Sequence, residues 1–72
     1  MQKFSGMLLR FSRINNGRYS FVLRGVEEGH QIDRRFVTHP ESTDHRLVEW
    51  EIGKTFDVEH EGRKAVITHY SV

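Results

Sequence analysis

The chain has 72 residues and a formal net charge of +1, which fits one small domain spanning residues 1–72 and excludes a large multi-substrate active site. It contains no cysteine, which excludes disulfides, thiolate nucleophiles and thiolate metal sites and is compatible with a reducing cytoplasm. No apolar run approaches the ~20 residues of a membrane span and no signal-peptide segment follows Met1, so we expect a soluble, cytoplasmic protein without a membrane partner.

The first twenty-four residues combine basic and aromatic side chains around a predicted turn. They contain five basic residues and no acidic residue, whereas the rest of the chain contains six basic and ten acidic residues. Short runs of β-branched and aromatic residues predict strands over 4–14 and 18–24, with the turn at 15–17. The small overall charge therefore conceals a strongly basic amino-terminal hairpin.

Two registers are compatible with this first hairpin. A two-residue turn at Asn16-Gly17 would take Phe11 and Phe21 out of register with each other. A three-residue loop over 15–17, with Gly17 in the left-handed position of a bulge, pairs Phe11 directly with Phe21. We favour the longer loop, because it creates one aromatic and basic face and leaves the other face for the core. It also pairs Arg13 with Tyr19 and directs Leu8 and Val22 into the core.

The middle of the chain predicts one further strand. The segment from Gly25 to Gly29 is predicted to be an acidic turn, and residues 31–38 to be a strand that ends before Pro40. The polar residues 40–46 predict a loop. Residues 47–52 are compatible with a strand or a single helical turn, because periodicity does not decide between them over so few residues.

The last predicted element is a hairpin over residues 54–70 with a turn at Glu61-Gly62. This turn would pair Phe56 with Ile67, Val58 with Ala65 and Glu59 with Lys64, which places apolar residues on one face and the charged pair on the other. Together the elements predict an all-β fold, a small five-stranded antiparallel barrel. The expected core residues are Leu8, Val22, Val37, Phe56, Val58, Ala65 and Ile67.

Four segments give nearly the whole chain a resemblance to cold-shock domains. Gly6-Met7-Leu8-Leu9-Arg10-Phe11-Ser12 is similar to the Gly-x-Val-Lys-Trp-Phe-Asn pattern of the family's first strand. Tyr19-Ser20-Phe21-Val22 is similar to Phe-Gly-Phe-Ile, and Arg35-Phe36-Val37-Thr38-His39 to Val-Phe-Val-His-Phe. Ile52-Gly53-Lys54-Thr55-Phe56-Asp57-Val58 is similar to the Gly-x-x-Val-x-Phe opening of the fourth strand. Arg10 stands where the family has its first-strand Trp.

The resemblance implies an OB-fold barrel whose second and third strands bind single-stranded RNA or DNA. The composition of the first hairpin indicates the same ligand, since aromatic rings stack on bases and basic side chains attract phosphates. The expected stacking residues are Phe11, Tyr19, Phe21, Phe36 and His39. The expected phosphate-binding residues are Lys3, Arg10, Arg13 and Arg18. A net charge of +1 is low for a dedicated binder, so we expect weak binding with little sequence specificity.

Each of these interpretations has an alternative. The aromatic rings would serve equally well as core residues, and the arginines as a solvated surface. Arg34-Arg35 is either structural or phosphate-binding, and Trp50 is interpreted as a core residue. The alternative function is a protein–protein interaction module, an adaptor or inhibitor that uses a charge-polarised barrel. Its acidic side would contain Glu27, Glu28, Glu49, Glu51, Asp57, Glu59 and Glu61.

Catalysis and cofactor binding find no support in the sequence. The five histidines never occur at i, i+2 or i, i+4 spacing, whereas a zinc site needs three or four converging ligands. No serine stands in a recognisable nucleophile motif, and no glycine-rich phosphate loop is present. We therefore expect a non-enzymatic protein without a metal or other cofactor.

Overall fold

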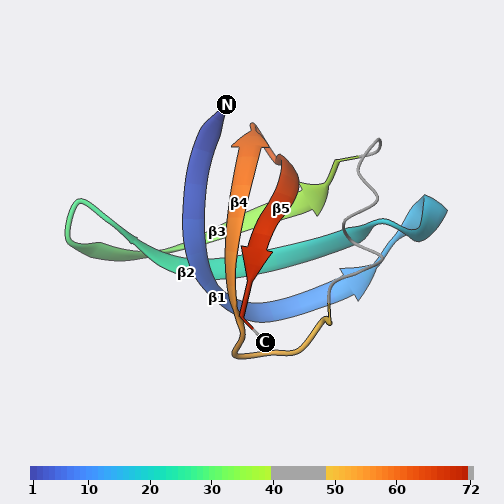
Figure 1. Cartoon of the computed structure of the whole chain (residues 1–72), viewed down its shortest axis with the longest axis horizontal. Helices are drawn as coiled ribbons and strands as arrows, with labels where there is room; N and C mark the ends of the chain where they lie inside the picture. Colours follow the sequence, from blue (N-terminus) through green and yellow to red (C-terminus); the bar gives the residue numbers. More distant parts are fainter. Residues whose placement is uncertain (40–48, 72) are drawn as a thin grey trace.

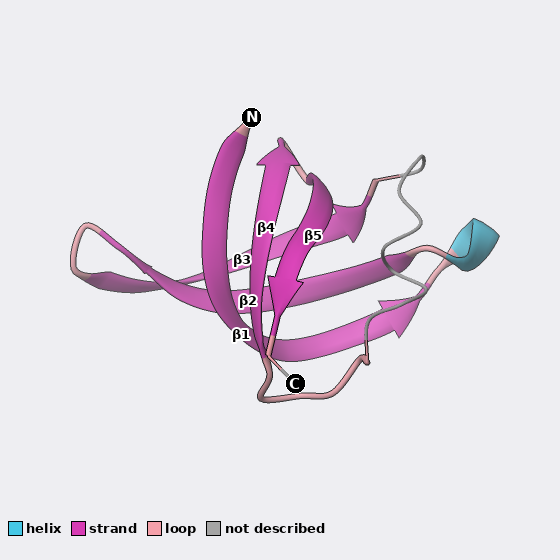
Figure 2. Cartoon of the chain, in the orientation of Figure 1, coloured by secondary structure: helices cyan, strands magenta, loops and turns pink. Residues whose placement is uncertain are grey.

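The structure is a computed structural model that describes residues 1–39 and 49–71 (Figures 1 and 2). Almost all of the described residues are in strands. The elements are β1 (Gln2–Arg13), the 3-10 turn η1 (Asn15–Gly17), β2 (Tyr19–Glu27), β3 (His30–Thr38), β4 (Thr55–Glu61) and β5 (Lys64–Tyr70). Within the described ranges, no helix has the length and apolar character needed to cross a membrane.

The five strands close into a barrel in the order β1-β2-β3-β5-β4. The predicted all-β, five-stranded, OB-like barrel is confirmed, but not every strand pair is antiparallel. β3 runs parallel to β5 where Val37 and Thr38 lie beside Lys64 and Ala65. The other neighbouring pairs are antiparallel. A closed ring with an odd number of strands cannot alternate direction throughout, so closure itself requires a parallel pair.

Strand β1 belongs to both halves of the barrel because it bends strongly along its length (Figure 1). Its first half pairs with β4 and its second half with β2. A Cβ atom on Gly6 would lie 2.6 Å from the carbonyl oxygen of Arg24, and a Cβ atom on Gly25 would collide with the backbone oxygen of Ser5. The two strands therefore cross so closely that both positions require glycine.

The register of the first hairpin is the predicted one, with Phe11 opposite Phe21 and Gly17 at φ 72°. The direction in which the side chains point, however, differs from the prediction. A bulge between Leu8 and Arg10 inserts one extra residue into β1, which exchanges the two faces of the strand beyond it. Phe11 and Phe21 therefore point towards the interior, whereas Arg10 lies on the outer face.

Aromatic and aliphatic residues of all five strands form the core. Leu8, Phe56, Val58, Ala65 and Ile67 are buried there, as the sequence predicts. Val22 is buried too, but on the outer face between Arg10 and Arg35 in the strand register, and Val37 is only half-buried. Among the described residues, the buried core cluster consists of Phe4, Leu8, Phe21, Leu23, Phe36, Phe56, Val58, Ala65 and Ile67.

Two buried polar side chains are satisfied by the backbone. The Thr38 hydroxyl accepts a hydrogen bond of 3.0 Å from the amide of Tyr19. His60 is 3% exposed, and its Nδ1 lies 3.0 Å from the carbonyl oxygen of Gly62. Since a carbonyl oxygen only accepts, Nδ1 of His60 must carry the proton. Its ring packs 4.9 Å from that of Phe36, so this histidine is part of the core.

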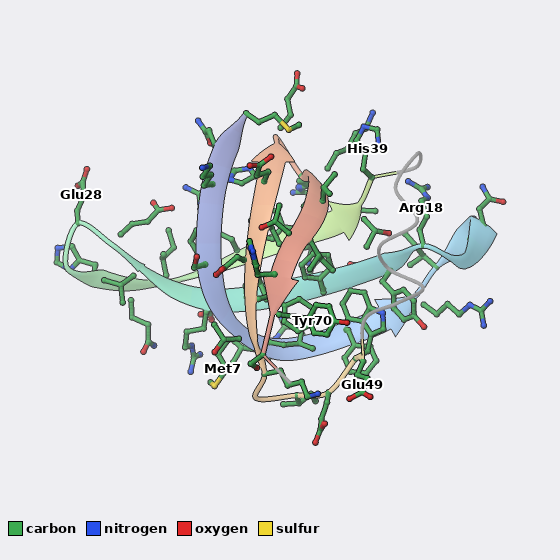
Figure 3. The ribbon with its side chains drawn as sticks, in the orientation of Figure 1. Met7, Arg18, Glu28, His39, Glu49 and Tyr70 are labelled. Carbon is green, nitrogen blue, oxygen red and sulfur yellow. The ribbon has the colours of Figure 1, made fainter. Side chains whose placement is uncertain are left out.

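The β2–β3 hairpin projects beyond the rest of the barrel (Figure 1). Its turn contains only Glu28 and Gly29, with φ of 52° and 79°, as in a type I′ turn. The predicted acidic turn from Gly25 to Gly29 is therefore too long, because the strand continues to Glu27. Figure 3 shows Glu28 at the tip of this hairpin and Arg18 at the opposite end of the molecule.

The predicted register of the carboxy-terminal hairpin is wrong by two residues. Glu61 pairs with Lys64, so the turn is Gly62-Arg63. Gly62 has a φ of 60°, and glycine at the first central position is typical of a type II′ turn. Because a shift of two residues keeps every side chain on the same face of the hairpin, the predicted apolar face is still correct.

Between β3 and β4, the predicted loop over 40–46 lies outside the described residues, as do residues 47 and 48. The described part of the predicted element over 47–52 is neither a strand nor a helix. A turn follows instead, closed by a 3.3 Å hydrogen bond from the amide of Lys54 to the carbonyl of Glu51. Gly53 has a φ of 97°, as the third residue of a type II turn requires.

Candidate nucleic-acid interface

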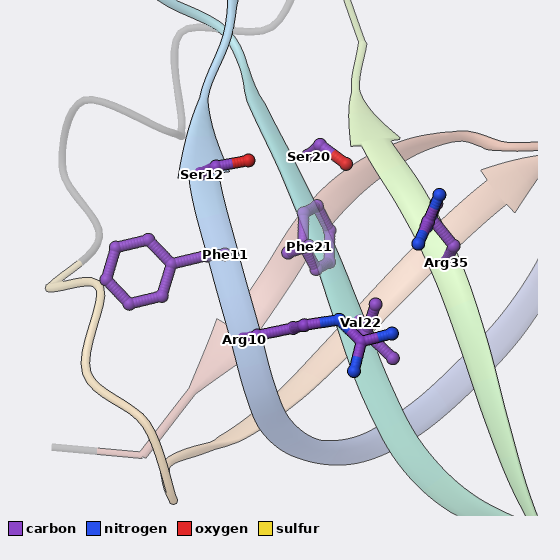
Figure 4. Close-up of a pocket in the computed structure, with 7 residues that line it drawn as sticks. All are labelled: Arg10, Phe11, Ser12, Ser20, Phe21, Val22 and Arg35. Carbon is purple, nitrogen blue, oxygen red and sulfur yellow. The ribbon is translucent and has the colours of Figure 1, made fainter.

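The outer face of β1, β2 and β3 contains a basic hollow (Figure 4). The strand register aligns Arg10, Val22 and Arg35 in one row across the three strands. The next row aligns Ser12 and Ser20. The hollow has a volume of about 310 Å³, and we call it the arginine hollow. Its lining residues are Arg10, Phe11, Ser12, Ser20, Phe21, Val22 and Arg35.

The two arginines approach the hollow from opposite sides. In Figure 4, the side chain of Arg10 extends from β1 towards Val22 on the central strand, and Arg35 stands on β3 beyond it. The phenyl ring of Phe11 points away from both guanidinium groups. The hollow therefore presents positive charge around a small apolar floor, with two serines beside it.

The electrostatic balance of this face leaves the hollow positive. One row further along β2, Arg24 donates hydrogen bonds of 2.9 and 3.2 Å to the carboxylate of Asp33. This contact is the main reason why the pKa of Asp33 is lowered and that of Arg24 raised, and the charge of Arg10 lowers the pKa of Asp33 further. Among the residues that the structure describes, neither Arg10 nor Arg35 forms a salt bridge.

Three half-buried rings form a second feature near the first hairpin. The rings of Tyr19 and Trp50 stack with their centroids 4.3 Å apart and an interplanar angle of 19°. The ring of Phe11 lies 5.6 Å from that of Trp50 and 6.2 Å from that of Tyr19. We call Phe11, Tyr19 and Trp50 the aromatic cluster. Each of the three residues is only partly exposed.

Trp50 is held in place by the turn that follows it. Backbone hydrogen bonds join Leu8 at the bulge to Gly53 and Lys54, at 2.9 and 2.8 Å. The ammonium group of Lys54 lies 2.9 Å from Glu49 and 3.6 Å from Glu51, the two neighbours of Trp50. The hydrogen bond with Glu49 is the main reason why the pKa of Lys54 is raised. The bulge that reverses the faces of β1 therefore also anchors the segment that carries the tryptophan.

Two of the predicted stacking residues are core residues instead. Phe21 and Phe36 are each 1% exposed, and their rings pack 5.8 Å apart. A ring without an accessible face cannot stack on a base, so the prediction is wrong for both. The physical reason is the bulge, which turns the aromatic face of the first hairpin inward, and β3 follows the same alternation.

The remaining predicted residues lie in different places. Arg13 is exposed opposite Tyr19, and Arg18 is half-buried at the base of the turn. His39 directly follows β3, where its amide donates to the carbonyl of Ala65. Lys3 is remote from the hollow, because it pairs with Glu59 across β1 and β4. It lines a separate depression of about 240 Å³ together with Asp57, Val58, Glu59, Thr68 and His69.

Sequence reasoning missed part of the site. It left the role of Arg35 open and assigned none to Ser12 or Ser20. Arg35 pairs with Val22 across β2 and β3, so the two side chains lie on the same face of the sheet. This pairing identifies Arg35 as part of the site only once Val22 is known to face outward. Trp50 was expected in the core, and it does pack against it, with its ring 5.3 Å from that of Phe21. Its stack on Tyr19 joins positions 31 residues apart, which no local pattern reveals.

Comparisons with known proteins do not extend this description. No protein-family model matches the chain, and searches of curated proteins and of solved structures find no similar protein. The fold and the site define a small OB-like β-barrel with a basic hollow on one face and a partly exposed aromatic cluster near its first hairpin.

Proposed function

We propose that this protein binds single-stranded RNA or DNA, weakly and without catalysis, across the outer face of β1, β2 and β3. The observation that carries the proposal is the arginine hollow, in which two guanidinium groups share one concavity without a salt bridge to any described residue. Guanidinium groups match the geometry of phosphate oxygens, and such a pair favours an anionic ligand.

The aromatic cluster is a second surface on which the bases of a single strand would stack. Phe11 and Tyr19 alternate with Arg10, Ser12 and Ser20 along their strands, so the cluster lies on the other face of the first hairpin, and a strand bound in the hollow would pass around the hairpin to reach it. Stacking of this kind depends little on base identity, so sequence preference should be slight. The resemblance to cold-shock domains implies the same class of ligand, although two of the stacking residues that it implies, Phe21 and Phe36, lie in the core. The absence of cysteine fits a cytoplasmic location, which is also part of the proposal.

A titration with short single strands tests the proposal. Backbone amide shifts should change along the outer face of β1 to β3, and affinity should fall as the salt concentration rises. Arg35→Ala should weaken binding and flatten this salt dependence. Arg34→Ala is the matched control, since Arg34 is bound to Glu27 by an ion pair of 3.0 Å and should leave the salt dependence unchanged. Tyr19→Ala should lose about 1–3 kcal/mol of affinity, the contribution of one stacked base.

Other outcomes would contradict the proposal. If neither pyrimidine-rich nor mixed single strands perturb any amide at low salt, the protein does not bind nucleic acid through this face. Recovery of a specific protein partner, lost when Arg10 and Arg35 are replaced by glutamate, would then favour the protein-interaction alternative.

A further inference from the structure

The two ends of the arginine hollow differ in charge. Towards the first hairpin, the hollow continues into the row of Ser12 and Ser20 and then towards the basic residue Arg18, which pairs with Ile14 at the base of the turn. In the other direction it meets the ion pair of Arg24 and Asp33. The carboxylate of Asp33 is ionised at neutral pH, as that of an aspartate ordinarily is, and the hydrogen bonds from Arg24 lower its pKa further. A phosphate chain that leaves the hollow towards the hairpin therefore meets a basic side chain, whereas one that continues in the other direction meets the carboxylate of Asp33.

The charge of the hollow suits a terminal phosphate better than an internal one. Arg10 and Arg35 lie on strands separated by one other strand, so their backbones are about 10 Å apart, and both side chains reach the same hollow. An internal phosphodiester carries one negative charge, whereas a terminal phosphomonoester carries about 1.5 to 2 at pH 7. The two guanidinium groups, neither of which forms a salt bridge with a described residue, therefore match the terminal group.

From these two observations we propose that the arginine hollow binds the terminal phosphate of a single strand, whose chain then runs along the row of Ser12 and Ser20 towards the first hairpin. This inference rests on the proposed function and makes it more specific. It assigns Arg10 and Arg35 to the phosphate, and it assigns Asp33 the role of excluding a chain that continues past the hollow.

The test compares one short oligonucleotide in three forms, with hydroxyl ends, with a 5′-phosphate and with a 3′-phosphate, at fixed salt. One of the phosphorylated forms should bind about tenfold more tightly than the hydroxyl form, the effect of one added hydrogen bond to a charged group. Arg35→Ala should remove this advantage, whereas the control Arg34→Ala should keep it. Asp33→Asn should reduce the advantage by improving the binding of the hydroxyl form, since internal phosphates are then no longer repelled.

The possible results separate the two proposals. Equal binding of all three forms would overturn the terminal-phosphate inference and leave the proposed function intact. A phosphate advantage that survives Arg35→Ala would also overturn it, because the phosphate would then lie elsewhere. If none of the three forms binds, both proposals fail.

Discussion

Replacing Phe36 by alanine should cost the protein a large part of its stability. The ring is 1% exposed and packs against Phe4 at 5.7 Å, Phe21 at 5.8 Å and His60 at 4.9 Å. Removing such a ring costs about 3–5 kcal/mol, because transfer free energy is lost and a cavity remains. At about 0.05–0.15 kcal/mol per residue, the whole chain has only about 4–11 kcal/mol of stability. Phe36→Ala should therefore lose at least about a quarter of this stability, and at the lower end of the range it should be unfolded at room temperature.

A milder variant allows the role of the Phe36 ring to be measured if Phe36→Ala does not fold. Phe36→Leu removes the aromatic ring but keeps most of the apolar volume, so it should be folded and less destabilised than Phe36→Ala. Urea unfolding followed by the fluorescence of Trp50 gives the free energy of unfolding of both variants. The affinity of folded Phe36→Leu for a single strand should equal that of the unchanged protein.

The opposite pattern would refute this reasoning. If Phe36→Ala costs less than about 0.5 kcal/mol, the range of ordinary surface substitutions, the ring is not in the core. If folded Phe36→Leu instead loses about 1–3 kcal/mol of affinity, the ring stacks on a base.

Three further predictions follow from the fold. Gly25→Ala should lower the free energy of unfolding by about 1–3 kcal/mol through overpacking against Ser5, and a normal urea midpoint would contradict the close crossing of β1 and β2. The lowered pKa of Asp33 contributes stability that is present above the unfolded pKa of about 3.9 and is lost as the pH falls through the lower folded value. The difference in melting temperature between the unchanged protein and Asp33→Asn should therefore shrink between pH 7 and pH 2. A constant difference would contradict this prediction. Within residues 1–39 and 49–71 no three His, Asp or Glu side chains could hold a metal, so dialysis against a chelator should leave the melting temperature unchanged.

Much of the fold was predictable because it depends on alternation and on turns. Short strands separated by glycine and asparagine indicated a small barrel. The register that pairs Phe11 with Phe21 was predicted correctly, although it was favoured for an outward aromatic face that the structure does not have. The carboxy-terminal hairpin shows how robust alternation is. Its register was predicted two residues away from the real one, and Phe56, Val58 and Ile67 still face the core.

The candidate site was less predictable because one inserted residue decides it. The bulge at Leu9 has no sequence signature of its own, yet it exchanges the faces of the second half of β1. Without it, the aromatic side of the hairpin would face outward, as the sequence suggested. With it, Phe21 enters the core and Arg10 joins Arg35 on the outer face. The long-range contact of Trp50 with Tyr19 was equally hidden, because it depends on how the chain returns after β3.

The projecting β2–β3 hairpin has a consequence for the solubility of the protein. β1 pairs with β2 no further than Arg24, and β5 meets β3 only near its end, so both outer edges of the hairpin lack a strand partner within the described part of the chain. Free edges of this kind invite pairing between molecules, which leads to aggregation. Here Arg24 and Asp33 form an ion pair on one face, and Arg34 and Glu27 form another on the opposite face. A strand that docked on either edge would have to desolvate these charges, so we expect the hairpin to remain unpaired even in concentrated solution.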